Sequence, residues 1–383
     1  MGVSPRRLCS RPAAVASCVG FVLIGMLQAL YGPAVPGLRE EYGLSPSGAG
    51  LGLSLHFTGG VAGVLAFNAI HSRISNRALL AASYGLMALG AAGFALAPDW
   101  PLALAAAFLG GLGFGGIDYG LNQLFAVGFG DRSTAMLNVL NAHFGIGAVL
   151  GPAVVAWVGP AAYPYAFGGC AVLAAALVVL GSRGVRTEVH EDAAASPARG
   201  LGLSRVLAGF LALYILNVAV EAGVGGWEPT HLETVGYTAT VAASATSVYW
   251  LMMTAGRFLV VPITLRYSPE RILTMCATGM TVCLLLALIK DVAPVAYAGV
   301  GLFIAPVFPT GLPWLNRALP QAQRAGAWVI AASMIGGVAA PPLLGMGIES
   351  SGIHAVPWLL TALSAASLAA TVWLIQLTRR FKE

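Results

Sequence analysis

Two stretches of this chain resemble each other although they lie far apart in the sequence. Residues 63–73 are GVLAFNAIHSR, and residues 256–266 are GRFLVVPITLR. Both begin with glycine, continue through mainly apolar residues and end in arginine. A second match pairs residues 147–152 with residues 337–342, at a shift that is shorter by three positions. The chain therefore consists of two related halves in the same orientation, and we expect the change of shift to fall in the loops.

The composition of both halves is that of a membrane protein. Of the 383 residues, 58% are hydrophobic and only 9% are charged, and the mean hydropathy is +0.81. A soluble domain carries roughly 25% charged residues, because its surface faces water. The composition therefore excludes a soluble enzyme, a disordered chain and an ordinary nucleic-acid-binding protein. The 49 glycines are expected where helices approach closely in lipid.

Twelve apolar runs are long enough to cross a bilayer, whose core of about 30 Å requires roughly 20 residues of helix. They cover residues 13–37, 47–70, 78–97, 101–127, 134–158, 162–182, 205–229, 238–264, 271–290, 292–315, 325–348 and 354–377. The charged, alanine- and proline-rich stretch at 183–204 is predicted to be a cytoplasmic linker. The predicted fold is an all-α membrane protein of twelve transmembrane helices in two six-helix bundles, residues 1–182 and 205–383.

The positions of the 20 lysines and arginines predict the orientation of the chain. Cytoplasmic loops carry an excess of these residues. The odd-numbered connections between spans hold only Arg39 and Lys290, and Arg257 lies inside a span. The remaining seventeen lie in the even-numbered connections and near the two ends of the chain. We therefore predict cytoplasmic N- and C-termini and a multi-pass location in the cell membrane.

Three segments resemble a known family. Residues 71–77, HSRISNR, match in part the loop motif of major facilitator superfamily transporters, with Arg73 in the basic cluster but without the acidic member. Residues 113–122, GFGGIDYGLN, and 137–148, LNVLNAHFGIGA, resemble the fucose–proton symporters and their sodium–glucose transporter relatives. The chain is thereby identified as a member of the major facilitator superfamily over essentially its whole length. The resemblance implies two bundles that rock about a central solute site.

Asp118 is the clearest candidate for binding a coupling ion. A charged side chain at the centre of a membrane helix costs about 2.5–3.5 kcal/mol, so its presence indicates function. Asn122 lies one turn further along the same face, and the pair matches the symporter segment. An aspartate that only joins two helices is the structural alternative, and Gly111 and Gly115 predict close packing of another helix. Gly32 replaces the first-helix acid of fucose-type proteins, so coupling through two carboxylates is not implied.

Glu221, on the seventh span, is a second candidate for ion coupling, or for binding a solute hydroxyl or amine. Asn217 lies one turn before it, and the glycines within residues 223–226 predict a bend or a break in the helix. An ion pair between Glu221 and Arg257 of the eighth span is the structural alternative. Arg257 itself is predicted to act as a latch.

Further candidates for solute contact are amide, imidazole and aromatic side chains within spans. Asn141 and His143 lie about 160° apart around one helix, and Asn141 is favoured as the cavity residue. Trp250 lies mid-span, away from the interfacial aromatic belt, and the prolines at 306, 309 and 313 predict an interrupted tenth span. The predicted solute-binding set is Gln28, Tyr31, Asn122, Asn141, His143, Asn217 and Trp250, and the gating or structural set is Arg73, Gly147, Gly151, Pro152 and Arg257.

These patterns predict a secondary active transporter for a small polar solute, with a sugar as the expected solute and a proton or sodium gradient as the driving force. No phosphate-binding loop and no catalytic or metal-ligand spacing is present, so neither an enzyme nor a metal site is predicted. No cofactor is expected apart from the transported ion. The expected partners are the solute and the lipid bilayer, with no nucleic acid, and the chain is expected to be a monomer. The alternative is a proton-driven exporter of drugs or secondary metabolites, because residues 147–152, GAVLGP, resemble the core of the superfamily's antiporter motif.

Overall fold

The computed structural model of the chain describes residues 11–71, 73–129, 133–181, 205–264, 266–319 and 326–380. The regular structure of these residues is helical. They group into two compact units, one drawn from Met1–Gly37 and Leu55–Ala194 and the other from Leu38–Ser54 and Ala195–Glu383. The predicted linker at 183–204 lies outside the described residues, so the division at that point stays a prediction.

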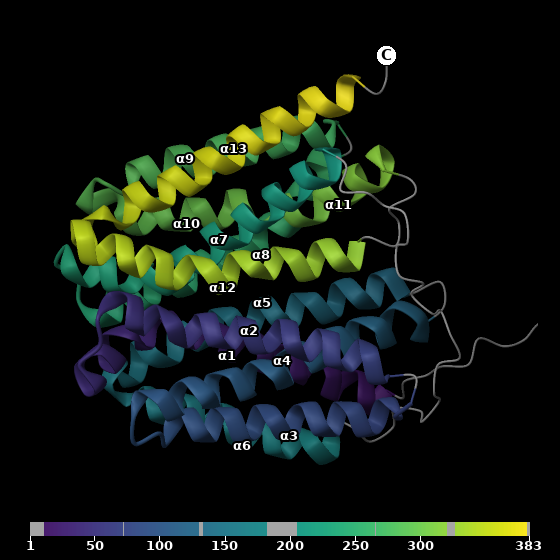
Figure 1. Cartoon of the computed structure of the whole chain (residues 1–383), viewed down its shortest axis with the longest axis vertical. Helices are drawn as coiled ribbons and strands as arrows, with labels where there is room; N and C mark the ends of the chain where they lie inside the picture. Colours follow the sequence, from purple (N-terminus) through teal and green to yellow (C-terminus); the bar gives the residue numbers. More distant parts are fainter. Residues whose placement is uncertain are drawn as a thin grey trace, which may run out of the picture. The chain divides into compact units, whose positions relative to one another are not determined.

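The first unit is built from helices that pack lengthwise. α3 lies against both α4 and α6, and α4 also contacts α5 (Figure 1). Two helix starts are capped by side chains: Ser75 Oγ accepts from the Ala78 N–H at 3.3 Å, and Asp99 Oδ1 accepts from the Leu102 N–H at 2.9 Å. The helices are α1 (Arg11–Tyr42), α2 (Pro46–Ile70), α3 (Asn76–Ala95), α4 (Trp100–Gly128), α5 (Ser133–Val158) and α6 (Tyr163–Leu180), with the short 3-10 helix η2 (Pro160–Ala162) before α6.

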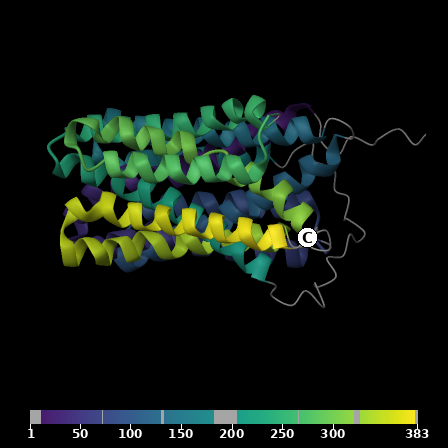
Figure 2. The ribbon, with the colours of Figure 1, turned by 90° about the horizontal axis from the view of Figure 1, so that it is seen from above.

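The second unit contains the remaining helices together with the adjoining ends of α1 and α2. α7 packs against α12 and α13, α8 against α10, and α9 against α13. Figure 2 shows α13, in yellow, running along the second unit, where it packs mainly against α7 and α9 rather than against α12. The helices are α7 (Arg205–Thr234), α8 (Ala239–Thr264), α9 (Pro269–Leu286), α10 (Ala293–Ile304), α11 (Val307–Ala318), α12 (Gly326–Ser351) and α13 (Val356–Arg380), with the 3-10 helices η3 (Lys290–Val292) and η5 (Ile353–Ala355).

The internal repeat is visible in the helix boundaries. α2, α3, α4 and α6 begin at positions 46, 76, 100 and 163, and α8, α9, α10 and α13 begin at positions 239, 269, 293 and 356. Each pair of starts is related by the same shift that places position 63 on position 256. The ends of α5 and α12, at positions 158 and 351, are related by this shift as well. The predicted repeat is therefore confirmed, but the expected change of shift in the loops is wrong.

The turns between helices repeat as well, because both halves use glycine where the backbone turns into the left-handed region. Gly43 and Gly159 have φ angles of 63° and 91°. Gly236 and Gly352, their counterparts in the second half under the same shift, have φ angles of 103° and 82°. A residue with a β-carbon is strained at these angles. These positions therefore fix the chain reversals at one end of the helices in each half.

The structure confirms one predicted interruption and corrects another. The tenth span is divided into α10 and α11, with Ala305 and Pro306 between them. The glycines at 223–226, in contrast, do not break α7, which runs without interruption from Arg205 to Thr234. They serve packing instead: a β-carbon on Gly223 would lie 2.6 Å from the Leu344 side chain.

Among the described residues, eleven helices are long and apolar enough to cross a membrane. α12 coincides with the remaining predicted span, 325–348. The all-helical, multi-span architecture is thus confirmed, while the count of twelve and the side on which the termini lie stay predictions.

Candidate functional site

Backbone contacts with α2 fix the position of α4, which carries Asp118. A β-carbon on Gly111 would overlap the carbonyl oxygen of His56, and one on Gly115 would overlap that of Gly60. Only glycine allows the two helices to approach this closely. The predicted packing role of Gly111 and Gly115 is therefore confirmed.

Three polar side chains of α4 and α5 form a hydrogen-bonded chain that ends on the Asp118 carboxylate. Asn141 Nδ2 donates to Asn122 Oδ1 at 3.0 Å, and Asn122 Nδ2 donates to Asp118 Oδ1 at 3.0 Å. Each amide also donates to a carbonyl one turn earlier in its own helix, Asn122 to Asp118 at 2.9 Å and Asn141 to Leu137 at 3.0 Å. The structure thus brings together three of the predicted site residues from two helices.

This arrangement can bind both a cation and a hydroxyl. All three side chains are partly exposed, and no described residue hydrogen-bonds the second carboxylate oxygen of Asp118. Because the amide N–H groups point along the chain toward Asp118, the free acceptors are that carboxylate oxygen and the Asn141 Oδ1. A proton or a sodium ion at Asp118 and a solute hydroxyl at Asn141 are both compatible with these acceptors.

Small residues hold α1 against α5, the helix that carries Asn141. A β-carbon on Gly147 would overlap the carbonyl oxygen of Val22, and one on Gly151 would lie 2.8 Å from that of Met26. Pro152 lies inside α5 and is buried. These contacts support the structural role predicted for the three α5 residues.

Two predicted solute contacts on α1 lie in the interior of the first unit. Tyr31 is 3% exposed, and its ring packs edge-on against Phe94 and Phe167, with centroids 5.2 Å apart in each case. Its hydroxyl lies 3.4 Å from His56 Nδ1. Gln28 is buried as well. The Tyr31 ring is therefore part of an aromatic cluster and does not stand as an open platform.

His143 and Arg73 do not join the chain that ends on Asp118. His143 Nδ1 donates to the Val139 carbonyl of its own helix at 2.7 Å, as expected from its position on the face away from Asn141. Arg73 is exposed just after the end of α2, where its backbone N–H donates to the Ile70 carbonyl at 2.9 Å.

In the second unit, Glu221 of α7 and Arg257 of α8 interact electrostatically but form no ion pair among the described residues. The Arg257 guanidinium instead contacts the Met253 sulfur at 3.9 Å. The Tyr249 hydroxyl donates to the backbone carbonyl of Glu221 at 3.4 Å, which leaves the Glu221 carboxylate without this donor. The alternative of an ion pair between Glu221 and Arg257 is therefore not realised among the described residues, and the role of Arg257 as a latch stays a prediction.

Asn217 and Trp250 are buried with unsatisfied polar atoms. Asn217 is 2% exposed, and its Oδ1 has no hydrogen-bond partner in the described part of the chain. Trp250 is 4% exposed, and its Nε1 is likewise unpartnered there. A β-carbon on Gly225 would lie 3.2 Å from the Trp250 ring, so the indole packs flush against α7. Both groups lie in the interior of the second unit.

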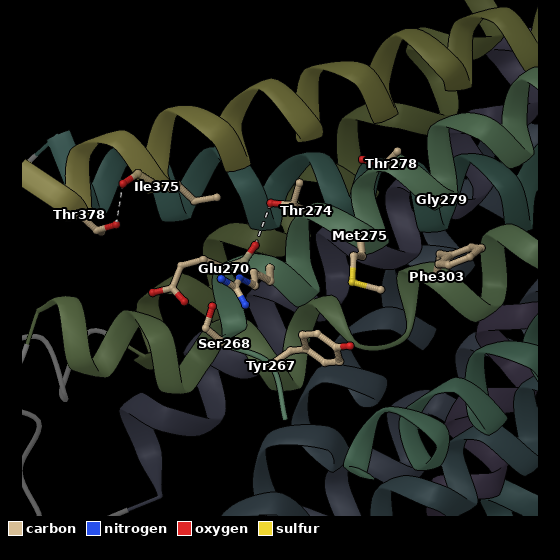
Figure 3. Close-up of a pocket in the computed structure, with 11 residues that line it drawn as sticks. Tyr267, Ser268, Glu270, Thr274, Met275, Thr278, Gly279, Phe303, Ile375 and Thr378 are labelled. Carbon is tan, nitrogen blue, oxygen red and sulfur yellow. Dashed lines mark hydrogen bonds between the residues drawn. The ribbon is translucent and has the colours of Figure 1, made fainter. Parts of the chain in front are cut away.

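A cavity of about 1100 Å³ opens in the second unit beside α9 and α13 (Figure 3). Arg271, Met275 and Phe303 are among the residues that line it. The Thr378 hydroxyl on its wall is already engaged with the Leu374 carbonyl at 2.9 Å. None of the predicted ion or solute residues lines this cavity, and we therefore place no solute in it.

The sequence patterns gave no indication of a buried polar group near the end of α7. Glu228 is 0% exposed and His231 is 3% exposed. His231 Nδ1 lies 3.1 Å from the Tyr297 hydroxyl of α10. Glu228 falls at the edge of the predicted span 205–229, where a carboxylate is expected to reach water, so its place in the span does not indicate its burial. A better signal was its spacing of seven residues from Glu221, which places both on one helix face.

A second contact that the sequence did not indicate joins the start of α2 to the end of α12. Glu349 Oε1 accepts from the Ser47 backbone N–H at 2.8 Å and from its hydroxyl at 2.5 Å. The Ser54 hydroxyl donates to the Val338 carbonyl at 2.5 Å. Hydrogen bonds from Ser47 lower the pKa of the exposed Glu349 carboxyl from its ordinary value of 4.5. These bonds are part of the reason that residues 38–54 group with the second unit.

Comparison with known proteins decides the family. The sequence profile of the Major Facilitator Superfamily matches residues 17–288 and 207–383. The chain belongs to this superfamily. It is thus a multi-pass membrane transporter of small molecules and not an enzyme.

Individual members of the superfamily resemble the chain along most of its length. The mouse sodium-dependent glucose transporter 1A is 24% identical over 373 residues, which cover 85% of this chain and 87% of that protein. The crystal structure of the nucleoside transporter NupG matches with a TM-score of 0.79 at 13% identity, over 95% of this chain and 98% of that one. The Escherichia coli fucose:proton symporter FucP matches with a TM-score of 0.64 at 17% identity, over 94% and 98%. The structural matches show the fold alone.

Proposed function

We propose that this superfamily member is a secondary active transporter of the cell membrane that moves a small polar solute, with a sugar as the first candidate, by alternating access. A proton or sodium gradient drives transport through Asp118, with Glu221 as a second ion-coupling carboxyl and no cofactor. The observation that carries the proposal is the chain of hydrogen bonds from Asn141 through Asn122 to Asp118. It joins a solute-binding amide to an ion-binding carboxylate across two helices.

The chemistry of the chain supports coupling. When Asp118 is charged, it accepts the Asn122 N–H strongly, because hydrogen bonds to a charged acceptor are about twice as strong as neutral ones. A proton or cation on Asp118 weakens that bond and allows the two amides to reorient toward the solute. Occupancy by the ion and affinity for the solute are therefore linked through Asn122. The mouse relative's name states a sodium dependence and a glucose substrate, which supports testing sugars and both ions first.

The test is uptake of a labelled sugar panel into proteoliposomes, with pH and sodium gradients imposed separately. Asp118→Asn should abolish gradient-driven accumulation and retain solute exchange, because exchange needs only a loaded carrier that reorients. Asp99→Asn is the matched control on the same helix, since asparagine replaces aspartate well as a helix cap. If Asp118→Asn accumulates solute as well as the wild type, Asp118 is structural, and Glu221 becomes the group to test.

The alternative transporter, a proton-driven exporter of drugs or secondary metabolites, is favoured by one observation. Gly147 and Gly151 of the GAVLGP segment, which resembles the antiporter motif, are among the residues that bring α5 onto α1. The same vesicles separate the two: an importer accumulates sugar when the ion gradient points inward, whereas an exporter shows solute-dependent proton movement in the opposite direction and no sugar uptake.

A further inference from the structure

Glu228 is a carboxyl that nothing in the proposed cycle uses. Its side chain is 0% exposed, and neither carboxylate oxygen has a hydrogen-bond partner among the described residues. It lies on the same face of α7 as Glu221, seven residues and two turns away, or about 10 Å along the helix axis. An isolated, buried carboxylate is so unfavourable that such a group takes up a proton instead.

The hydroxyl groups that α8 places near Glu228 also donate to backbone carbonyls. The Thr246 hydroxyl of α8 lies beside the carboxyl as a shared donor, because it also donates to the Ala242 carbonyl at 3.3 Å. Tyr249, also on α8, donates to the Glu221 carbonyl at 3.4 Å. Apart from the shared Thr246 proton, these groups offer Glu228 oxygen lone pairs rather than donors. A protonated carboxyl, which can donate, satisfies this environment, whereas a carboxylate does not.

No cation of the described residues compensates a charge on Glu228. Arg257 of α8 interacts with Glu221 and Tyr249, and Tyr297 is the titratable group that α10 presents to Glu228. The described residues of α11, α12 and α13 contribute no charged group that interacts with it. The site therefore has the composition of a proton site rather than that of an ion pair.

A hydrogen-bonded pair leads from this site toward the end of α7. The Tyr297 hydroxyl, which is close enough to Glu228 to interact with it electrostatically, lies 3.1 Å from His231 Nδ1, and the two rings pack edge-on with centroids 5.8 Å apart. His231 in turn interacts electrostatically with His354 of η5, which contacts α7 and is exposed at His354. The charge pattern predicts that this end of the helices lies outside the cell.

We propose that Glu228 is a proton-binding carboxyl of this transporter, and that Tyr297 and His231 connect it to the end of α7 at which His354 is exposed. When Glu228 releases its proton, the carboxyl O–H bond breaks and the Tyr297 oxygen accepts the proton. The Tyr297 hydroxyl proton passes to His231 Nδ1, and the proton on Nε2 leaves to water. Glu228 ends as a carboxylate, and the tyrosine and the histidine end neutral.

Infrared spectroscopy of the purified full chain in lipid tests proton occupancy without any assumption about transport. The carbonyl band of a protonated carboxylic acid should be present in the wild type at neutral pH and reduced in Glu228→Gln. Glu233→Gln, which removes a half-buried carboxyl five residues further along α7, should leave the band unchanged. Identical bands in the wild type and Glu228→Gln would overturn the proposal.

A second variant tests the path while Glu228 stays in place. Transfer of the wild type into D₂O should shift the Glu228 band as its proton exchanges, and His231→Gln should retain the band but slow its exchange at least tenfold. Exchange at the wild-type rate in His231→Gln would overturn the assignment of the path.

The use of this proton in transport rests on the proposed function and has a separate readout. In proteoliposomes, Glu228→Gln should reduce accumulation driven by a pH gradient at least tenfold and retain solute exchange at equal pH. Accumulation equal to that of the wild type would overturn a coupling role. If the wild type itself accumulates no solute under any gradient while the infrared band remains, the proposed function fails and the proton site stands.

Discussion

Asp118 and Glu228 show how the surroundings of a carboxyl decide what it can do. Asp118 is partly exposed and accepts an amide N–H at 3.0 Å, so its charged form is supported by a donor. Glu228 is fully buried, and the donor beside it is the Thr246 hydroxyl, which it shares with a backbone carbonyl. Two carboxyls of similar chemistry are thus suited to different tasks, one to exchanging an ion with a solute site and the other to holding a proton.

Asn122 bonds Asp118 directly, whereas Asn141 is one hydrogen bond further away, so replacing the two amides should affect ion and solute binding differently. Asn122→Ala removes a hydrogen bond to a charged group, worth about 1.5–3 kcal/mol, and should change the apparent affinity for the coupling ion roughly tenfold to a hundredfold. Asn141→Ala removes only neutral hydrogen bonds and should raise KM for the solute about two- to tenfold with the ion dependence retained. Initial uptake rates over a matrix of ion and solute concentrations measure both. A larger effect on the ion dependence from Asn141→Ala would contradict the order of the chain.

At the scale of the helices, backbone contact between glycines governs the first unit. α2 and α4 touch through Gly111, Gly115, Gly60 and the His56 carbonyl, and α1 and α5 touch through Gly147 and Gly151. These contacts place Asp118 and Asn141 within one hydrogen bond of Asn122. Side-chain volume on either pair of helices would separate the polar residues as well as the helices.

Gly115→Ala tests this dependence. The new β-carbon would overlap the Gly60 carbonyl oxygen, and such overpacking costs about 1–3 kcal/mol. We expect a lower melting temperature in detergent. Gly85→Ala is the matched control, because a β-carbon at Gly85 of α3 meets nothing within 4 Å, and alanine is favoured over glycine in a helix by up to about 1 kcal/mol. If both variants melt at the wild-type temperature, backbone contact does not limit this interface.

The contact between α2 and α12 should depend on acid pH. Because the pKa of Glu349 is lowered in the folded protein, the contact contributes its full stability above the ordinary value of 4.5 and loses it as the pH falls through the lower, folded value. The difference in melting temperature between the wild type and Glu349→Ala should therefore be constant from pH 7 to about 5.5 and narrow below about 4.5. Ser47→Ala, which removes the hydroxyl donor and retains the N–H donor, should lower the melting temperature at pH 7 by part of the amount that Glu349→Ala does. A melting-temperature difference between the wild type and Glu349→Ala that is unchanged in acid would show that the carboxylate charge does not stabilise this contact.

At the scale of the whole chain, the internal repeat extends beyond sequence similarity to helix starts and turn glycines. Its main departure is functional: α4 is continuous where α10 and α11 are interrupted at Pro306. Under the shift that relates the two halves, Asp118 corresponds to Gly311, which has no side chain to bind an ion. The two halves therefore share an architecture but carry their carboxyls on different helices, α4 in one and α7 in the other.

The charge distribution gives a prediction about orientation at this scale. Single cysteines placed at 39–46 or 230–237 should react with an impermeant thiol reagent from outside intact cells, and cysteines placed at 183–204 should react only from the cytoplasmic side. Labelling of the same sites in inside-out vesicles gives the reverse pattern and serves as the control. External labelling at 183–204 would invert the topology and, with it, the side from which protons reach His231.

The sequence by itself determined the class of protein, the position of nearly every helix and the link between Asp118 and Asn122. These features depend on apolar content and on contacts one turn apart, which are local properties of the chain. The hydrogen bond between Asn141 and Asn122, in contrast, depends on the packing of α5 against α4. The ion pair between Glu221 and Arg257, which the sequence left open as the structural alternative, is not formed in the described part of the chain.

Only the tertiary structure decided which polar groups lose contact with water. Glu228 lies at the edge of a predicted span and carried no prediction from the sequence, yet the packing of α7 against α8 and α10 buries it fully. The glycines at 223–226 likewise predicted a break, but neighbouring side chains fill the space beside them and α7 continues. Burial and helix continuity are sums over contacts between segments distant in sequence, and a local pattern cannot contain them.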